Sequence, residues 1–313
     1  MPLLSYAVRR IGQTLPVALL VTVLIFLLIK LLPGDPASAI LGDRASDEAV
    51  RALQRQWGLD RPLPEQYGIY MRNLVTGNLG QSLRYRTPVV DLLPRRMTVT
   101  MFLVVYSLAL SIVIAVPLAM VAASNRDRWP DHIVRGLITV PLASPAFWVG
   151  ILLLILFALT LRWFPASGYG EGFAGHVRHL FLPALTLSQF FAAVLTRNLR
   201  STLIDVQTTT YVDFARAKGL DRQAVLFRHV LRAALLPIVT LVGVRLSYAI
   251  GGSVVIETVF SLPGLGSWMV ESIFARDYMV VQTLTLAFAF GAMLINLVTD
   301  LIYQLFDPRV RLG

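Results

Sequence analysis

The strongest constraint on the fold of this 313-residue chain is a set of long runs without a charged residue. A helix that crosses a lipid bilayer needs about 20 predominantly apolar residues. Five uncharged runs reach or approach that length, and a sixth is interrupted only by Arg245. We therefore predict an all-α polytopic membrane protein with six transmembrane helices, at residues 11–29, 97–123, 136–161, 180–196, 233–256 and 278–299.

Composition supports a membrane protein over a soluble one. The chain is 56% hydrophobic and 15% charged, with a mean hydropathy of +0.67, whereas soluble domains are about half apolar and about a quarter charged. The formal net charge of +10 would also suit a nucleic-acid binder, but basic cytoplasmic loops explain it, so no nucleic-acid partner is predicted. The chain has no cysteine, which excludes disulfides, thiolate metal sites and cysteine nucleophiles.

The distribution of basic residues predicts the orientation. An even number of spans puts both termini on one side, and Lys and Arg are enriched in cytoplasmic loops. With cytoplasmic termini, the inner segments hold fourteen Lys/Arg against six acids, and the outer segments hold twelve against eleven. Nine of those twelve lie in a 65-residue outer loop, which is long enough to escape the rule. We predict that both termini are cytoplasmic.

The first apolar run is predicted to be a transmembrane helix that stays in the protein. It could instead be a signal peptide, because Ala37-Ser38-Ala39 resembles a cleavage site. Its 19 uncharged residues exceed the 7–15 residues of a signal peptide's apolar region, so a retained helix is favoured. With the first helix retained, the predicted topology divides the chain into four parts. They are an N-terminal segment with the first helix (1–32), an extracytoplasmic loop domain (33–97), a five-helix core with a cytoplasmic loop at 197–235 (98–306), and a cytoplasmic tail (307–313).

The predicted outer loop, residues 33–97, is expected to be folded. Ser46, followed by two acids, is a helix-start signal, and Gly58 is a left-handed stop. Pro64 opens a second helix that ends near Gly77. Two short amphipathic helices are therefore expected here, either as a docking platform or as a loop packed on the bilayer surface.

Several kinds of catalytic chemistry are missing from the sequence. It has no P-loop for nucleotides, no H-E-x-x-H zinc motif and no G-x-S-x-G hydrolase motif. His176 and His179 could face one metal, but no third ligand is evident. We predict a protein that is not an enzyme, without catalytic residues, bound metal or a cofactor of its own. A membrane-embedded enzyme and a self-contained channel or carrier are the rival interpretations.

Few ionisable residues lie within the predicted spans, and such residues are functional candidates by default. Arg245 is about ten residues into its helix, or about 15 Å deep. Asn296 and Asp300 approach the same depth from the last helix. We predict that Arg245 faces one of them or the transport pathway, either as a structural charge pair or as a substrate contact. The lack of other buried carboxylates disfavours a self-powered carrier.

The longest predicted cytoplasmic connection, 197–235, contains a helix–turn–helix pattern. Thr210 and Asp213 resemble a capping box, and Lys218-Gly219 is a helix-stop signal. Small residues next to a tight turn would fit a groove in a partner, although a solvated loop would show the same periodicity. The candidate contact residues are Tyr211, Asp213, Phe214, Ala215, Arg216, Ala217, Lys218 and Gly219.

A short segment at 259–277 is too short to span the membrane. Pro263, Gly264 and Gly266 break the chain, and Trp268 begins a short apolar face. We predict an interfacial or re-entrant helix near the outer mouth, with these four residues as gate candidates. The alternative is a surface helix anchored by Trp268.

The cytoplasmic loop resembles that of a known family. Residues 211–220, YVDFARAKGL, continuing through RHVLRAALLP at 228–237, are similar to the E-A-A-x-x-x-G loop of ABC importer permeases. The A-R-A-K-G-L form, with Asp213, Phe214 and Ala215 at the Glu-Ala-Ala positions, is that of dipeptide, oligopeptide and nickel permeases. Four further segments resemble the same family: LPGDP at 32–36, GNLGQS at 77–82, ETVFSLPGLG at 257–266 and DPR at 307–309.

The resemblance implies an ABC type I importer permease fold and the B-type member of a permease pair in the bacterial cytoplasmic (inner) membrane. It implies a C-type permease partner, two cytoplasmic ATPase subunits that carry ATP and Mg, and an extracytoplasmic substrate-binding protein. Residues 211–219 would then be the ATPase-coupling helix. The implied substrates are di- or oligopeptides, with nickel or haem-like compounds as alternatives.

Overall fold

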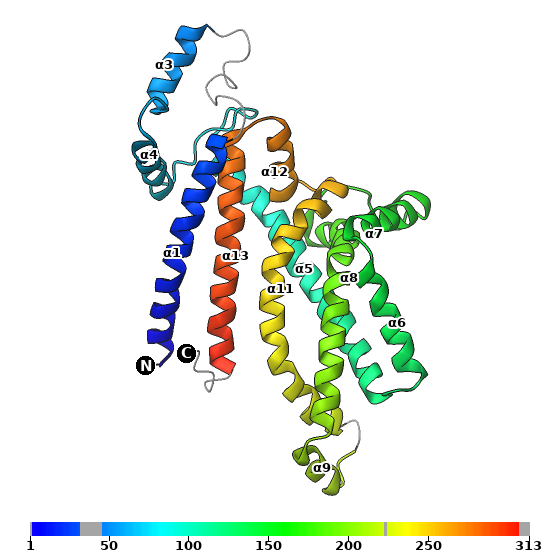
Figure 1. The fold of residues 1–313 in the computed structure, drawn as a ribbon. Helices are drawn as coiled ribbons and strands as arrows, with labels where there is room; N and C mark the ends of the chain where they lie inside the picture. The colour runs from blue at the N-terminus through cyan, green and yellow to red at the C-terminus, as the bar shows by residue number, and fades with distance from the viewer. Residues whose placement is uncertain (1, 32–45, 222–223, 307–313) are drawn as a thin grey trace.

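The computed structural model describes residues 2–31, 46–221 and 224–306, and these residues are almost entirely helical. The long helices run side by side (Figure 1). The start of α1 and the end of α13 lie at the same end of the molecule, as an even number of spans requires. The long elements are α1 (Pro2–Leu31), α5 (Val89–Ser124), α6 (Trp129–Ala143), α7 (Ala146–Leu153) continued by the π-helix η1 (Leu154–Thr160), α8 (Gly172–Gln207), α11 (Arg232–Val259) and α13 (Tyr278–Phe306).

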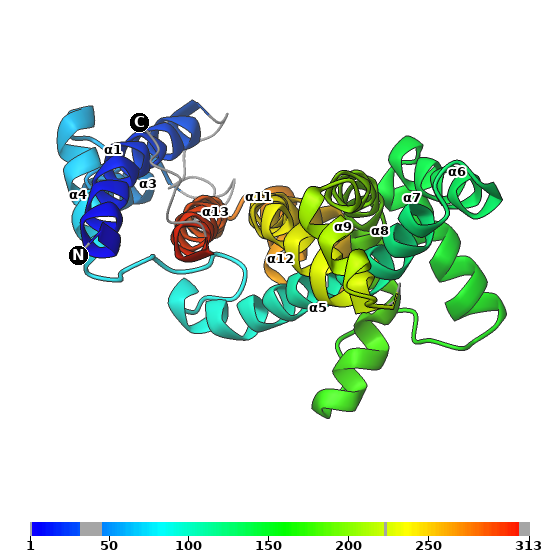
Figure 2. The ribbon, with the colours of Figure 1, turned by 90° about the horizontal axis from the view of Figure 1, so that it is seen from below.

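The structure accounts for most of the predicted spans. Within the described residues, four helices are long and apolar enough to cross a membrane, and a bent pair makes a fifth candidate. The remaining predicted span lies in α11, of which Tyr248–Val259 forms the apolar part described. α11 lies between α8 and α13 in both views (Figures 1 and 2). The all-α membrane architecture is thus confirmed, and six spans remain a prediction.

The apolar run at 136–161 is not one straight helix. It breaks between α6 and α7 with a bend of 104°. Pro145 follows the break and has no N–H to donate, and it pushes Ser144 into an extended conformation with φ −105° and ψ 137°. Hydropathy detects the apolar length of this segment, but the proline decides its direction.

The segment between α1 and α5 forms the two predicted helices, α3 (Asp47–Trp57) and α4 (Leu63–Val75). The Ser46 side chain accepts a hydrogen bond from the backbone N–H of Ala49 at 3.3 Å, and Gly58 is left-handed with φ 67°. Pro64 occupies the first turn of α4. Local capping signals are therefore sufficient to place these helix ends. The motif segments at 32–36 and 307–309 lie outside the described residues.

The first helix stands at the edge of the bundle, against α13 (Figures 1 and 2). The Arg10 guanidinium is paired with the Asp300 carboxylate on α13, with Nε 2.7 Å from Oδ2. Near the other end of α1, the hydroxyls of Thr22 and Tyr67 are 2.8 Å apart, which ties this helix to α4. The 36-residue helices α5 and α8 pack together at the centre.

Candidate functional site

A short helix, α9 (Thr210–Ala217), lies at the end of α8, far from the end of the bundle that carries α12 (Leu265–Phe274) (Figure 1). In a capping box, Thr210 would be the N-cap and the helix would begin at Tyr211. The helix instead begins at Thr210. The backbone N–H groups of Val212 and Asp213 instead bond to the carbonyl oxygen of Thr209, at 3.0 and 3.4 Å. The predicted helix is therefore present, with its start shifted by one residue.

The turn after α9 depends on a glycine, as predicted. Gly219 has φ +78°, in the left-handed region that side chains oppose. The backbone N–H of Leu220 bonds back to the carbonyl oxygen of Ala215 at 3.4 Å, which closes the helix. A side chain at residue 219 would meet no atom of this chain within 4 Å. The constraint on Gly219 within this chain is therefore conformational.

One side of α9 is buried against its own chain. Val212 is fully buried and Ala215 is 7% exposed, and both belong to a core cluster with Val225 and Val230 of η2 (Val225–Leu231). Leu203, in the last turns of α8, joins the same cluster. The small side chain of Ala215 thus fits this chain's own core, whereas the sequence reading assigned it to a partner's groove.

The opposite side of α9 is exposed and partly apolar. Phe214 is 66% exposed and Tyr211 is 44% exposed, although large hydrophobic residues usually lie inside. Of the other candidates, Asp213, Ala217, Lys218 and Gly219 are exposed, and the side chain of Arg216 lies outside the described part of the chain. We call the exposed apolar residues of this unit the α9 face; its members are Tyr211, Phe214, Leu220 and Phe227.

A buried ion pair joins α6 to the half of α8 that leads to α9. Arg200 donates from Nε to Oδ1 of Asp131 at 2.6 Å, and its second nitrogen bonds to the other carboxylate oxygen. Asp131, on α6, is fully buried and also accepts from the backbone N–H of Asp127 at 3.0 Å. This bidentate pair joins the α5–α6 turn to α8. No local sequence pattern predicts this pair, because the partners are 69 residues apart.

The end of the bundle far from α9 carries α12, the short helix predicted within 259–277. Pro263 is exposed, whereas Gly264, Gly266 and Trp268 are buried. Trp268 is fully buried in a cluster with Val89 of α5 and with residues of α13. Trp268 is therefore a core residue, and the alternative in which it anchors the helix at the membrane surface is wrong.

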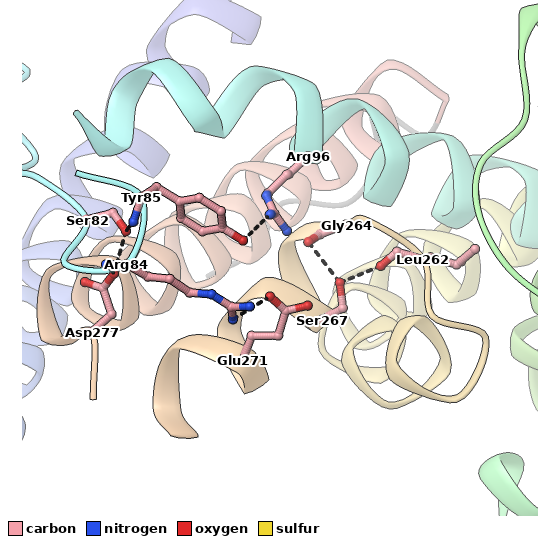
Figure 3. A network of polar contacts seen from close by, with 9 residues as sticks. All are labelled: Ser82, Arg84, Tyr85, Arg96, Leu262, Gly264, Ser267, Glu271 and Asp277. Carbon is pink, nitrogen blue, oxygen red and sulfur yellow. Dashed lines mark hydrogen bonds and ion pairs between the residues drawn. The ribbon is translucent and has the colours of Figure 1, made fainter. Parts of the chain in front are cut away.

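Polar contacts tie the segment after α4 to α12 and α13 (Figure 3). The Ser82 hydroxyl donates to Oδ2 of the buried Asp277 at 2.6 Å, and Arg84 pairs with Glu271 at 3.3 Å. The guanidinium of Arg96 donates to the Tyr85 hydroxyl at 3.1 Å and lies 4.8 Å from the Trp268 ring centre. Ser82 of the GNLGQS segment and the residues that follow it thus hold the α4–α5 connection on the bundle.

The charge predicted to meet Arg245 has another partner. Asp300 is paired with Arg10 of α1, and the side chain of Arg245 lies outside the described part of the chain. Asn296 is exposed on α13. The role of Arg245 stays a prediction.

The two histidines that could face one metal, His176 and His179, lie in the first turns of α8. The Nδ1 atom of His176 is 3.0 Å from the carbonyl oxygen of Tyr169, and that of His179 is 2.9 Å from the carbonyl oxygen of Gly175. Among the described residues, no group of three His, Cys, Asp or Glu side chains could hold a metal ion.

Comparison with known proteins now decides the family. Residues 115–312 match the binding-protein-dependent transport system inner membrane component, and residues 3–104 match the N-terminal part of such membrane components. The chain belongs to this family of ABC importer permeases. The permease is 42% identical, over 97% of its length and 98% of the relative's, to a putative peptide transport system permease protein of Brucella abortus. It is 38% identical, over 99% of both chains, to the glutathione transport system permease protein GsiC of Escherichia coli.

Solved structures show that the permease shares its fold with importers. Its helices superpose on a chain of the MetNI methionine ABC transporter in an inward-facing conformation, with a TM-score of 0.58 and 17% identity. That match covers 68% of the permease and 95% of the transporter chain. A chain from an amino acid ABC transporter with histidines matches with a TM-score of 0.50 and 13% identity, over 70% of the permease and 94% of that chain. The predicted family and fold class are confirmed, and the chain is a multi-pass membrane permease.

Proposed function

We propose that this permease forms half of the translocation pathway of an ATP-driven, binding-protein-dependent peptide importer. In this proposal a related C-type permease supplies the other half, in the bacterial cytoplasmic membrane. Two cytoplasmic ATPase subunits bind ATP and Mg and contact α9. An extracytoplasmic binding protein delivers the substrate. The peptide assignment draws on the relatives named as peptide and glutathione transport permeases.

The single observation that supports the coupling role is the α9 face at the end of α8. At about 1.5 Å per residue, the 36 residues of α8 extend about 54 Å. The hydrocarbon core of a bilayer is about 30 Å thick, so α8 can cross it and still carry α9 beyond it. A helix with an exposed phenylalanine and an exposed tyrosine outside the membrane calls for a protein partner.

Reconstitution tests this function directly. Liposomes containing this chain, the C-type permease and both ATPases should accumulate labelled peptides only with ATP and the binding protein. Replacing the P-loop lysine of the ATPases should stop uptake, since the proposal assigns ATP hydrolysis to those subunits. ATP-independent uptake by this chain alone would contradict the proposal and support a channel or carrier. Accumulation of nickel or haem in place of peptides would contradict only the substrate assignment.

The proposed orientation predicts which introduced cysteines can be labelled from outside. The chain has no native cysteine, so there is no background on it. Arg55→Cys on α3 and Glu171→Cys before α8 lie at exposed positions and should react with a membrane-impermeant maleimide on intact cells. Arg126→Cys, in the exposed turn after α5, should react only after the cells are opened. The neighbouring Gly170 is not used as a cysteine site, because a side chain there would clash with His179.

The reverse labelling pattern would overturn the proposed orientation. Labelling of both groups from outside would contradict the number of spans between them. This test also examines the proposed layout, in which the segments 33–97 and 162–179 are extracytoplasmic and the turn 124–135 is cytoplasmic.

A further inference from the structure

The carboxylate of Glu257, in the last turn of α11, is buried at the outer end of the bundle and makes three hydrogen bonds. Its Oε1 accepts from the hydroxyl of Thr100 on α5 at 2.8 Å. Its Oε2 accepts from the backbone N–H groups of Gly266 and Ser267 at 2.7 and 3.1 Å. A buried carboxylate is tolerated only when it is well hydrogen-bonded, and here both oxygens act as acceptors.

The same two side chains complete the start of α12. The first turn of a helix leaves free N–H groups, which here belong to Leu265, Gly266 and Ser267. The N–H of Leu265 donates to the Thr100 hydroxyl at 2.8 Å, and Glu257 accepts from the other two. The helix dipole favours a negative charge at this position. Because the preceding residue, Gly264, has no side chain, the cap of α12 is supplied by α5 and α11.

Two glycines allow this close approach. A side chain at Gly264 would collide with the Glu257 carboxylate and the Thr100 hydroxyl, and one at Gly266 would collide with the backbone of Val254. The carboxylate can therefore reach the N–H groups only when α12 is fully seated against α11. Ser272 and Trp268 of α12, at 3% and 0% exposure, are covered in this seated arrangement.

We propose that Glu257 is a positioning residue for transport, and that together with Thr100 it seats α12 across the outer ends of α5 and α11 and keeps this end closed at rest. The inference rests on the proposed function, because closure matters only in a transporter. When the cap is lost, α12 moves away from α11 and its covered side is exposed to water. Glu257 itself contacts no substrate in this scheme.

The test measures exposure of α12 in the assembled transporter. Ser272→Cys is introduced as a reporter, and its rate of reaction with a membrane-impermeant maleimide is measured without ATP. Glu257→Gln has the same size but replaces one acceptor oxygen with an NH₂ donor. It should raise the reaction rate about fivefold or more, since an unsatisfied buried partner shifts an equilibrium by at least that factor. Thr100→Val should also raise the reaction rate of the cysteine at residue 272. Thr100→Ser keeps the hydroxyl and should leave that rate at the parent value.

Thr258→Val is the matched control. The Thr258 hydroxyl is next to Glu257, but it is exposed and donates to the Val254 carbonyl of its own helix at 2.8 Å, so the parent rate is expected. The amount of assembled complex is measured for every variant. If Glu257→Gln does not assemble, Thr100→Val tests the proposal in its place. Parent rates in the assembled Glu257→Gln and Thr100→Val complexes would overturn the proposal. If the complex that carries only Ser272→Cys showed no uptake, the proposed function would be contradicted. The maleimide reaction rates of the variants could still be compared with one another.

Discussion

Replacing Phe214 with aspartate should abolish ATP-driven uptake while the permease remains inserted and folded. The side chain is 66% exposed on α9, so its loss removes little packing within this chain. In an ATPase interface it would be an aromatic anchor, and losing such an anchor typically costs about 2 kcal/mol or more. That corresponds to binding weakened about thirtyfold. ATPase co-purification and hydrolysis stimulated by loaded binding protein are the measurements.

Two further variants make this test specific. Gly219→Val should also reduce coupling, because a side chain opposes the left-handed turn by about 1–2 kcal/mol. Gln207→Ala, at the end of α8, is the control and should leave transport unchanged. Ala215→Trp is uninformative, because Ala215 is buried in this chain and overpacking would unfold the loop. Normal coupling in both Phe214→Asp and Gly219→Val would show that α9 is only a solvated connector.

Breaking the Asp131–Arg200 pair should cause the largest loss of stability. Asp131→Asn leaves the Arg200 guanidinium, which is only 19% exposed, without its charged partner. Removing one member of a buried pair typically costs about 3–5 kcal/mol, and the lower value suits a partly exposed arginine. The amount of permease in the membrane and its melting temperature in detergent should both fall. Uptake should fall in proportion to the amount of permease that remains.

The pairing itself is tested by a second substitution. Asp131→Leu combined with Arg200→Met removes both charges and should recover most of the lost stability, since apolar replacement of a buried pair is often neutral. Arg126→Gln breaks an exposed pair with Asp127 at 3.3 Å and should change stability by less than about 1 kcal/mol. If the double variant is no better than Asp131→Asn, packing around residue 131 matters more than the pair.

Features that depend on neighbouring residues could be predicted from the sequence. The apolar runs gave the long helices, Ser46 and Gly58 gave both ends of α3, and Gly219 gave the turn after α9. Each of these signals acts within a few residues, through helix length, hydrogen bonding of free backbone groups, or allowed backbone angles. The family resemblance, carried by short segments in a constant order, was confirmed by the matched relatives.

What the sequence by itself determined was therefore the class of fold, the ends of α3 and the presence of the short helix α9 with its glycine turn. Only the tertiary structure decided which side of α9 is buried, so that Phe214 and not Ala215 is available to a partner. It also decided that Asp131 meets Arg200 and that Asp300 meets Arg10, across separations of 69 and 290 residues. Contacts between distant residues depend on how whole helices pack, and no local pattern of one sequence specifies that packing.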